Sequence, residues 1–433
     1  MDDPAARTVT IELHGWAHGG EAVGRLPDGR ACFVPYALPG ETVQVRVTRQ
    51  YKRHATAELV SVVVASPHRV SAPCPYYGVC GGCQLQHAAP AHQLQLKRRV
   101  LVEQLTRIGR QPDPPVAEVT APAGGWPAGY RSWARMAVDD EGRLGFRRRA
   151  SHAIEPIAHC LLMTPEASAL RDAAGDGWQG AHEVTLTAGE DSGLLTVHPG
   201  GDGLPLIPDG TFGVGIRQAD PAGPTAVIRP PDHVTVQVGG IALRASAGAF
   251  FQAGPAGAAA LVEAVMAAVD PAPGEHILDL YAGVGLFSAF LARRGARVTA
   301  VEADPVATAD ARANLAGLGV EVRTETVEEA LADVDAADVV LLDPPRSGAK
   351  AQVCAAIVAM APRRIVYVAC DPAALARDVA TLTDLGYRLQ FVQGIDLFGH
   401  TAHVEAVAVL LPAVPGEGSA GTTDREGWRG PPP

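Results

Sequence analysis

Residues 276–287 read HILDLYAGVGLF, an apolar run that passes through two glycines into a second apolar run. The first run predicts a β-strand, and the residues from 286 onward predict a helix. Gly283 and Gly285 then lie in the turn between them, where the missing side chains let a ligand approach the backbone. A nucleotide is the ligand that we expect at such a turn.

Helix and strand alternate on both sides of this motif. We expect a helix at 256–269 before it, and the strand RVTAVEA and a helix at 305–316 after it. Further strands are expected near 320–324, 338–342 and 365–369. Two later β-runs, YRLQFVQGIDLF and HVEAVAVLL, are separated by only a short loop, which predicts an antiparallel hairpin. Residues 251–412 are therefore expected to form a Rossmann-like α/β domain.

An acidic residue and the glycine spacing narrow the choice of nucleotide. Glu302 ends the second strand, where its carboxylate can accept hydrogen bonds from both hydroxyls of a ribose. A dinucleotide-binding fingerprint would have a third glycine at position 288, which is Ser288. The spacing Asp279-x-x-x-Gly283-x-Gly285 is instead typical of adenosylmethionine-dependent methyltransferases. We therefore expect S-adenosylmethionine as the methyl donor.

A cysteine ends another strand of the same domain. The sequence VACDP at 368–372 places Cys370 at the carboxyl end of an apolar β-run, where open α/β sheets bind their ligands. Asp371-Pro372 begins the next helix directly beside the thiol. This position suits a nucleophile, although most free cysteines are buried and inert.

Two carboxylates are expected near that thiol. Asp343 begins the sequence DPPRSG directly after the apolar strand VVLL, so it can hold a base or the donor; a rigid Pro-Pro turn is the structural alternative. Glu405 begins the last strand and lies at the same rim of the sheet, although without this context it would be interpreted as a surface glutamate.

Short alternating β-runs fill the N-terminal part of the chain. TVTIEL, ACFVPYAL, ETVQVRVTR and ATAELVSVVV, with glycine-rich turns between them, predict an OB-like β-barrel over residues 1–65. Residues 66–250 mix β-runs with glycine and proline turns, which predicts a central α+β domain built on an antiparallel sheet. The tail at 413–433 is expected to be disordered.

Four of the seven cysteines form a spacing pattern. Cys74, Cys80 and Cys83 are spaced C-x5-C-x2-C beside a Gly-Gly pair, and Cys160 follows much later. Three thiols at this spacing can surround one small metal centre, because the glycines let backbone amides approach sulfur. Zinc and an iron–sulfur cluster both fit the bare spacing. No histidine stands at a ligand spacing within the loop, which favours a cluster.

Length and charge indicate the general class. A chain of 433 residues suggests two or three domains, and it contains neither an eighteen-residue apolar stretch nor an apolar signal-peptide core, so we expect a cytoplasmic monomer. The net charge is −11, but residues 1–160 carry +5 and residues 161–433 carry −16. This asymmetry fits a basic surface that brings an anionic polymer to an acidic catalytic domain. The candidate phosphate contacts are Arg49, Lys52 and Arg53, Lys97-Arg98-Arg99, and Arg143 with Arg147-Arg148-Arg149, each of which could also be a solvated surface.

Longer motifs resemble known families. The sequence GWAHGGEAVGRLPDGRACFVPYALPGETV resembles the TRAM domain, an RNA-binding barrel. LDPPRSG, YVACDPAALARD and DLFGHTAHVEAVAVL resemble successive signatures of the RNA 5-methyluridine methyltransferase family, whose catalytic domain is of class I. The likeness extends over nearly the whole chain. With its TRAM domain and cysteine quartet, the chain is similar to bacterial 23S ribosomal RNA (uracil-5-)-methyltransferases, whereas transfer-RNA enzymes of the family usually lack both features.

The resemblance implies roles for ten residues. Cys370 would be the nucleophile and Glu405 the base; the donor would contact Gln252, Tyr281, Glu302 and Asp343; and a [4Fe-4S] cluster would be held by Cys74, Cys80, Cys83 and Cys160. A thiolate that adds to C6 of uracil makes C5 nucleophilic enough to accept a methyl group, and a base then removes the C5 proton. The target base must leave its stack to reach such a pocket.

One departure from the family bears on activity. The family usually has Cys-Asn-Pro where this chain has Cys370-Asp371-Pro372, and a carboxylate beside the thiol is expected to oppose thiolate formation. An RNA-binding or ribosome-assembly protein with weak or lost catalysis is therefore the alternative function. A transfer-RNA uridine methyltransferase is a further alternative, because neither Cys370 nor Glu405 distinguishes the two RNAs.

Overall fold

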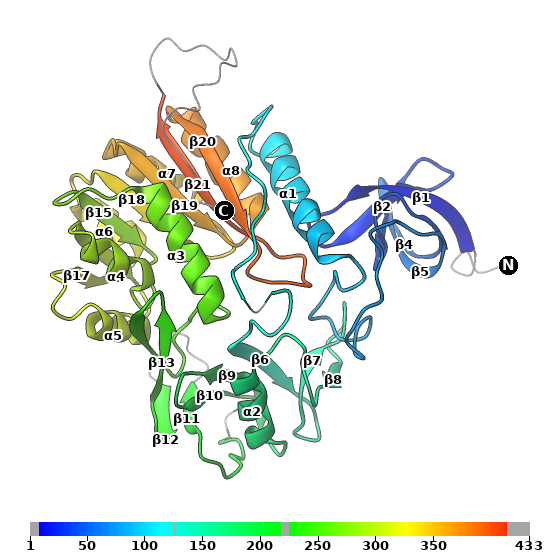
Figure 1. The fold of residues 1–433 in the computed structure, drawn as a ribbon, viewed down its shortest axis with the longest axis horizontal. Helices are drawn as coiled ribbons and strands as arrows, with labels where there is room; N and C mark the ends of the chain where they lie inside the picture. The colour runs from blue at the N-terminus through cyan, green and yellow to red at the C-terminus, as the bar shows by residue number, and fades with distance from the viewer. Residues whose placement is uncertain (1–7, 125, 202, 218–224, 414–433) are drawn as a thin grey trace.

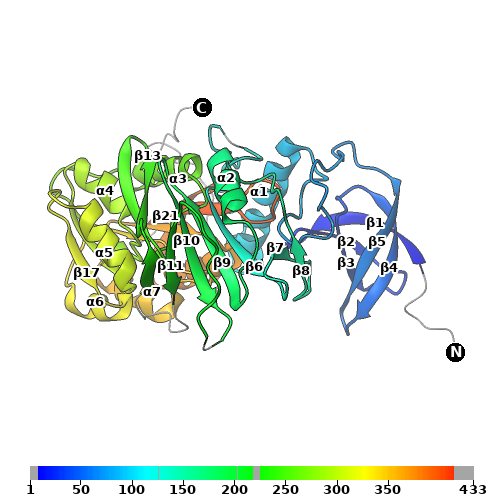
Figure 2. The ribbon, with the colours of Figure 1, turned by 90° about the horizontal axis from the view of Figure 1, so that it is seen from below.

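The structure is a computed structural model that describes residues 8–124, 126–201, 203–217 and 225–413. It contains three sheets of different kinds and a separate hairpin. Figures 1 and 2 both show a small barrel at one end of the molecule and an α/β sheet at the other, with a second large sheet between them. The expected disordered tail lies outside the described residues, apart from residue 413.

The N-terminal barrel is confirmed. Its five strands close in the order β1-β2-β3-β5-β4, and side chains along β1 and β4 alternate between interior and solvent, as a barrel requires. Ile11, Leu13, Val43 and Val45 are among the residues that fill the interior. The strands are β1 (Thr8–Trp16), β2 (Glu21–Arg25), β3 (Ala31–Pro35), β4 (Thr42–Gln50) and β5 (His54–Val64).

The central sheet has seven strands in the order β12-β11-β10-β9-β6-β7-β8. The expected antiparallel pairing holds for every neighbouring pair except β10 and β11, which are parallel. The segment at 200–212 joins those two strands and is long enough to return the chain to the same end of the sheet. The elements are β6 (Trp133–Val138), β7 (Leu144–Arg147), β8 (Ile154–Pro156), α2 (Pro165–Ala174), β9 (Ala181–Ala188), β10 (Gly193–Pro199), β11 (Gly213–Arg217) and β12 (Thr225–Arg229).

The C-terminal sheet is the predicted Rossmann-like one. Its order is β17-β16-β15-β18-β19-β21-β20, in which the first five strands are parallel and β21 runs antiparallel to both of its neighbours. The predicted hairpin is therefore β20 with β21. The strands are β15 (His276–Leu280), β16 (Arg297–Glu302), β17 (Glu321–Thr324), β18 (Val339–Leu342), β19 (Arg364–Ala369), β20 (Tyr387–Ile395) and β21 (Glu405–Pro412). The helices are α3 (Pro255–Val269), α4 (Leu286–Arg293), α5 (Pro305–Asn314), α6 (Val327–Asp333), α7 (Lys350–Ala359) and α8 (Pro372–Asp384).

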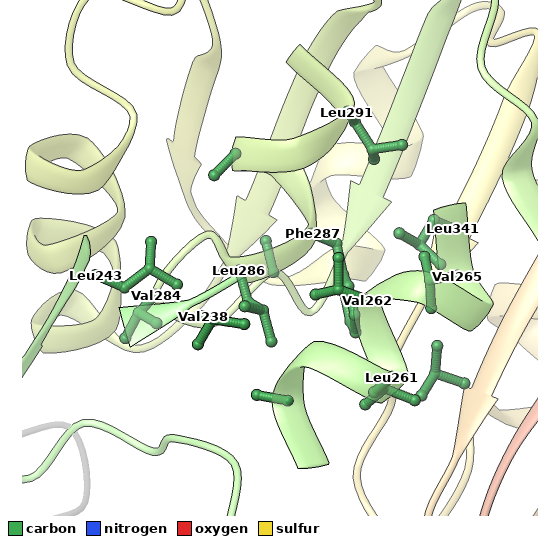
Figure 3. Packing of buried hydrophobic residues seen from close by; sticks show 14 of the residues in the cluster. Val238, Leu243, Leu261, Val262, Val265, Val284, Leu286, Phe287, Leu291 and Leu341 are labelled. Atoms are coloured by element: carbon green, nitrogen blue, oxygen red, sulfur yellow. The ribbon is translucent and has the colours of Figure 1, made fainter. Parts of the chain in front are cut away.

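Hydrophobic cores cover both faces of this sheet. Along β18 and β19, successive residues belong alternately to one core and to the other, which fits the two-residue period of a strand. One core contains α3, α4 and the hairpin of β13 (His233–Val238) and β14 (Ile241–Ser246); Figure 3 shows Leu243 beside Val284 and Val238 beside Leu286. Residues on both sides of the expected boundary at 250 thus share this core.

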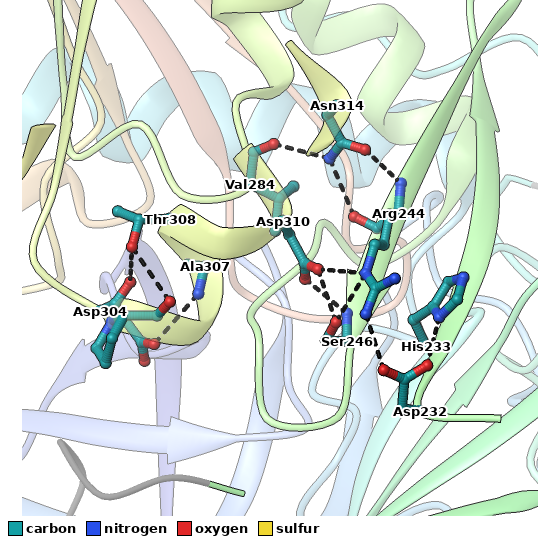
Figure 4. A network of polar contacts seen from close by, with 11 residues as sticks. Asp232, His233, Arg244, Ser246, Val284, Asp304, Ala307, Thr308, Asp310 and Asn314 are labelled. Carbon is teal, nitrogen blue, oxygen red and sulfur yellow. Dashed lines mark hydrogen bonds and ion pairs between the residues drawn. The ribbon is translucent and has the colours of Figure 1, made fainter. Parts of the chain in front are cut away.

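Two elements tie the rest of the chain to the C-terminal sheet. Helix α1 (Pro90–Arg107) contributes Leu101 and Leu105 to the second core and packs against α8. On the other side, Arg244 of β14 binds Asp310 of α5 and Asp232, in a network that Figure 4 shows. In the described part of the chain, no helix is both long and apolar enough to span a bilayer.

Candidate active site and cysteine loop

The glycine loop is open on one side and closely packed on the other. Tyr281, Gly283 and Gly285 all have positive φ angles of 62°, 55° and 83°. A Cβ atom at Gly283 would meet no atom within 4 Å, whereas one at Gly285 would lie 2.9 Å from Leu315 Cδ1. Gly285 therefore allows close packing of the loop on α5, and Gly283 leaves the backbone accessible to a ligand.

Glu302 fixes this loop from the neighbouring strand. Its Oε2 accepts a hydrogen bond from the Gly283 amide at 3.0 Å, and its Oε1 accepts one from the Asp304 amide at 2.8 Å. Each carboxylate oxygen has a second lone pair, so both can still accept a ribose hydroxyl. Asp304 also pairs with Arg217 at 2.9 Å, which connects the central sheet to the start of α5.

Sequence reasoning treated Ser288 as a missing glycine and did not assign Asp279 a contact. The Ser288 hydroxyl donates to Asp279 Oδ2 at 2.6 Å, and both side chains are fully buried. Burial raises the pKa of Asp279 to about 7, against the hydrogen bonds from Ser288 that lower it. The spacing of Asp279 and Ser288 could have indicated this hydrogen bond, because it places a carboxylate near the end of a strand and a hydroxyl in the first turn of the following helix.

Three of the four expected donor-binding residues end neighbouring strands. Tyr281 follows β15, Glu302 ends β16 and Asp343 follows β18, and the Asp343 amide donates to Leu280 O at 3.2 Å. Burial, and then Asp279 nearby, raises the pKa of Asp343. Gln252 is buried in the loop between β14 and α3, and in the described ranges no hydrogen bond joins it to the other three.

Strand register brings Cys370 and Glu405 together. In the antiparallel pair β19–β21, Ala369 lies opposite Ala406, so the next position along the two strands sets Cys370 opposite Glu405. Glu405 is 3% exposed, and its Oε2 has no hydrogen-bond partner within the described residues. An unsatisfied buried carboxylate oxygen is uncommon and points to a functional group.

The surroundings of Cys370 favour the neutral thiol. Burial first, then Glu405 and Asp343, raise the pKa of Cys370 to about 12, against Arg346, which lowers it. The pKa of Glu405 is also raised, by burial first and by Asp343 second. A thiol beside the start of a helix usually has a lowered pKa, whereas here burial and the two carboxylates raise the pKa.

The carboxylate of Asp371 interacts with α8 and with the barrel. Its side chain caps α8 by accepting a hydrogen bond from the Ala374 amide at 2.7 Å. Its Oδ2 lies 3.5 Å from Nε2 of His18, which comes from the turn between β1 and β2 of the barrel. Asn and Asp cap helices about equally well. The residues that raise the thiol pKa are Glu405 and Asp343.

The cysteine loop and the distant Cys160 meet at one cavity. Cys74, Cys80, Cys83 and Cys160 all line it, together with Arg131. Arg131 is a partly buried cation that interacts electrostatically with Cys160 and Cys83, and no carboxylate within the described residues forms an ion pair with it. Four thiolates around a cluster carry net negative charge, so this donor set and this cation fit such a group. The described residues include no group of three or more His, Cys, Asp or Glu side chains drawn together tightly enough for a single metal ion.

The structure corrects part of the expected phosphate surface. Lys97 is 1% exposed and pairs with the buried Asp396, so it cannot contact a phosphate. Arg98 donates to Val116 O at 2.8 Å and Arg99 to His14 O at 3.1 Å. Further arginines form ion pairs within the chain: Arg143 with Asp139, Arg148 with Glu155, and Arg149 with Glu21.

The turn between β4 and β5 keeps its expected basic surface. Arg49, Lys52 and Arg53 are exposed there. Tyr51 is 43% exposed and stacks on His54, with ring centroids 4.4 Å apart. Cations around an exposed aromatic ring are the combination that binds single-stranded nucleic acid.

Family models match three parts of the chain. They are the TRAM domain at 6–60, the methyltransferase small domain at 240–367 and tRNA (uracil-5-)-methyltransferase at 322–413. Among solved structures, the Pyrococcus abyssi tRNA (uracil-54, C5)-methyltransferase in complex with S-adenosyl-L-homocysteine is similar, with a TM-score of 0.71 and 25% identity over 93% of this chain and 99% of that chain.

Whole-length relatives agree with these matches. An uncharacterized RNA methyltransferase of Streptomyces avermitilis is 39% identical over 94% of this chain and 98% of its own length. The 23S rRNA (uracil(1939)-C(5))-methyltransferase RlmD of Acidithiobacillus ferrooxidans is 36% identical over 90% of this chain and 94% of its own length. Identity at this level over nearly whole chains, together with the family models, shows that this chain belongs to the family of RNA (uracil-C5)-methyltransferases.

Proposed function

We propose that this chain transfers a methyl group from S-adenosylmethionine to C5 of a uridine in RNA, with 23S ribosomal RNA as the substrate. The observation that supports this most directly is the register of β19 and β21, which sets Cys370 opposite the unsatisfied carboxylate of Glu405. Asp343 lies beside both and ends the strand next to the glycine loop. A nucleophile, a base and a donor site thus share one rim of the sheet.

The donor site is proposed to consist of Gln252, Tyr281, Glu302 and Asp343. Glu302 would accept the ribose hydroxyls while it holds Gly283 in place. The open space at Gly283 leaves room for the donor against the loop backbone. The donor supplies the methyl group that C5 accepts.

The protein's own groups would act in two steps. Cys370 loses its proton to solvent, and the thiolate adds to C6 of uracil, which makes C5 an enolate carbon that attacks the methyl group. After transfer, Glu405 removes the C5 proton, and the C6–S bond breaks to regenerate the thiolate. Arg346 favours the ionised thiol. A carboxyl group with a raised pKa is suited to accept that proton near neutral pH.

A [4Fe-4S] cluster is proposed to occupy the cavity lined by Cys74, Cys80, Cys83 and Cys160. The four thiols around one cavity and the partly buried Arg131 that lines it support this assignment. The cluster would cross-link the loop to the central sheet and is assigned a structural role, since it lies in a different part of the fold from the donor site. A zinc site is the alternative to the cluster, and measuring the zinc and iron content of the purified protein distinguishes the two.

Ribosomal RNA is preferred to transfer RNA as the substrate. Among the relatives that match nearly the full length of this chain, those with a named substrate, such as RlmD of Acidithiobacillus ferrooxidans, are named as 23S rRNA enzymes. A specific observation favours the alternative, because the similar solved structure is a tRNA (uracil-54, C5)-methyltransferase. The alternative function, an RNA-binding protein without catalysis, is suggested by Asp371 alone. The carboxylate of Asp371 caps α8, which weakens this alternative.

The test combines a cellular and a chemical measurement. Deleting the chain from cells should remove 5-methyluridine from one position of 23S ribosomal RNA, whereas loss from transfer RNA only would reassign the substrate. The purified protein should form a covalent adduct with RNA that contains 5-fluorouridine, because fluorine at C5 cannot be removed as a proton. The Cys370→Ala variant should form none, and the matched Cys354→Ala variant, which lacks a buried thiol of α7, should behave as wild type. An undiminished adduct in Cys370→Ala would overturn the nucleophile assignment.

A further inference from the structure

The loop that precedes Glu405 is held by the cysteine loop. Residues 396–404 connect β20 to β21, and within them the backbone of His400 has a positive φ of 65°, which a non-glycine residue adopts only when its surroundings hold it. His400 O accepts hydrogen bonds from the amides of Gln84 and Leu85, at 3.0 and 2.9 Å. Both donors directly follow Cys83.

The side chain of Gln84 makes the same connection again. Its Oε1 accepts a hydrogen bond from the Ala402 amide at 3.2 Å, and its Nε2 donates to Gly81 O at 2.7 Å, so one amide group bridges the two loops. Tyr77 donates to Gln84 O at 2.8 Å from the other side of the cysteine loop. Gln84 is thus fixed within that loop while it binds the backbone three residues before Glu405.

Other contacts to this loop come from the same region of the chain. The Gln93 Oε1 of α1 accepts the His400 amide at 2.9 Å, Lys97 donates to Phe398 O at 3.1 Å, and Tyr130 donates to Gly399 O at 3.1 Å. These contacts fix residues 398–400, so Gln84 is the side chain that extends the support to Ala402. Glu405 begins β21 and pairs with Ile395 of β20, and its Oε2 has no hydrogen-bond partner in the described part of the chain, so its carboxylate is positioned through the backbone of β21 and of the loop before it.

We propose that Gln84 is a positioning residue for the proton-removal step, acting through Ala402 on the placement of Glu405. The inference rests on the proposed role of Glu405 as the base. It predicts that losing the Gln84 amide slows removal of the C5 proton more than it slows methyl transfer, because Cys370 and the donor loop do not depend on Gln84. A general structural role would slow both steps or neither.

The test uses full-length protein that retains its iron, and RNA with tritium at C5 of uridine. Methyl incorporation and tritium release are followed in a single turnover for wild type, Gln84→Met, Gln84→Glu and Gln95→Met. Gln95 is the matched control, since it lies on the exposed side of α1 and, among the described residues, its side chain bonds only to His92. In Gln84→Met, tritium release should fall on the order of tenfold relative to methyl transfer, and methylated RNA bound covalently to the protein should accumulate.

The two remaining variants and hydrogen exchange complete the test. Gln84→Glu keeps an oxygen that can accept from Ala402, so most of the tritium release should return. Amide exchange at 400–402 should become faster in Gln84→Met only. Equal slowing of both steps, loss of iron together with all activity, or unchanged tritium release in Gln84→Met would each overturn the inference. A wild-type protein that methylates no RNA would instead refute the proposed function, which keeps the two failures distinct.

Discussion

At the scale of single residues, Cys370 lies among groups that oppose its ionisation. Burial, Glu405 and Asp343 raise the pKa of the thiol, and Arg346 alone among its charged neighbours lowers it. In the sequence, the carboxylate beside the thiol is that of Asp371. In the fold, the carboxylates that raise the pKa of the thiol are Glu405 and Asp343, which come from neighbouring parts of the sheet. The protein without RNA should therefore hold Cys370 as an unreactive thiol.

Replacing Glu405 by Gln should make Cys370 more reactive. The pKa of Glu405, raised to about 8, leaves the carboxyl group partly ionised at pH 8, and a neutral amide removes that charge from beside the sulfur, so the pKa of the thiol falls and the fraction of thiolate rises. A fall of about one pKa unit would make alkylation about tenfold faster below that pKa. Alkylation by iodoacetamide at pH 8, quantified by mass spectrometry of the peptide that contains Cys370, measures this.

The control for this prediction is Glu103→Gln, which removes a carboxylate on α1 that pairs with Arg107. It should leave the alkylation rate at Cys370 unchanged. A slower or equal rate in Glu405→Gln would show that the Glu405 carboxylate does not interact with the thiol in solution.

At the scale of elements, the cysteine loop lies outside the helices and strands and carries the strongest expectation of a bound group. Protein purified without oxygen should be brown and contain about four irons per chain. Cys80→Ser should lose the iron and the colour, because one ligand of four is removed. Cys32→Ser, at a buried thiol of the barrel, should retain both. Stoichiometric zinc without iron, measured by metal analysis, would assign a zinc site instead.

Local patterns predicted most elements, and contacts between distant elements explain what they missed. The glycine loop, the last hairpin and the barrel could be predicted from short patterns of apolar and polar residues, such as the alternation that appears as alternating burial along β4. Lys97 read as part of a basic run because its partner Asp396 is 299 residues away. The parallel pairing of β10 and β11 depends on the path of a long connection. The meeting of Cys370 and Glu405 needed strand register, which only the folded sheet defines.

At the scale of the whole molecule, three parts of the chain converge near Cys370. The barrel contributes His18 beside Asp371, the cysteine loop contributes Gln84 beside Ala402, and the C-terminal sheet contributes Cys370 itself. A Cβ at Gly20 in the same barrel turn would lie 2.9 Å from the Ala402 Cβ, so the barrel packs closely against the loop before Glu405. The barrel thus packs beside the rim of the sheet that carries Cys370 and Glu405.

The exposed turn between β4 and β5 should provide the electrostatic part of RNA binding. Replacing Arg49, Lys52 and Arg53 together by Gln removes three cations that have no carboxylate partner in the described ranges, so fewer counterions are released when RNA binds. The slope of log Kd against log salt should become shallower by about 2, as three single-stranded phosphate contacts predict. Filter binding of an RNA substrate fragment from roughly 50 to 200 mM salt measures the slope.

Three other arginines, each paired with a carboxylate, provide a control variant with the same change of net charge. Arg46, Arg107 and Arg110 pair with Glu58, Glu103 and Asp384, and their replacement by Gln alters the net charge by the same amount. This triple variant should retain the wild-type slope, because a cation already paired with a carboxylate gives up that partner to contact a phosphate. If both triple variants reduced the slope equally, the net charge of the protein rather than the barrel turn would govern RNA binding. If neither did, the phosphate contacts would have to lie elsewhere on the central or C-terminal sheets.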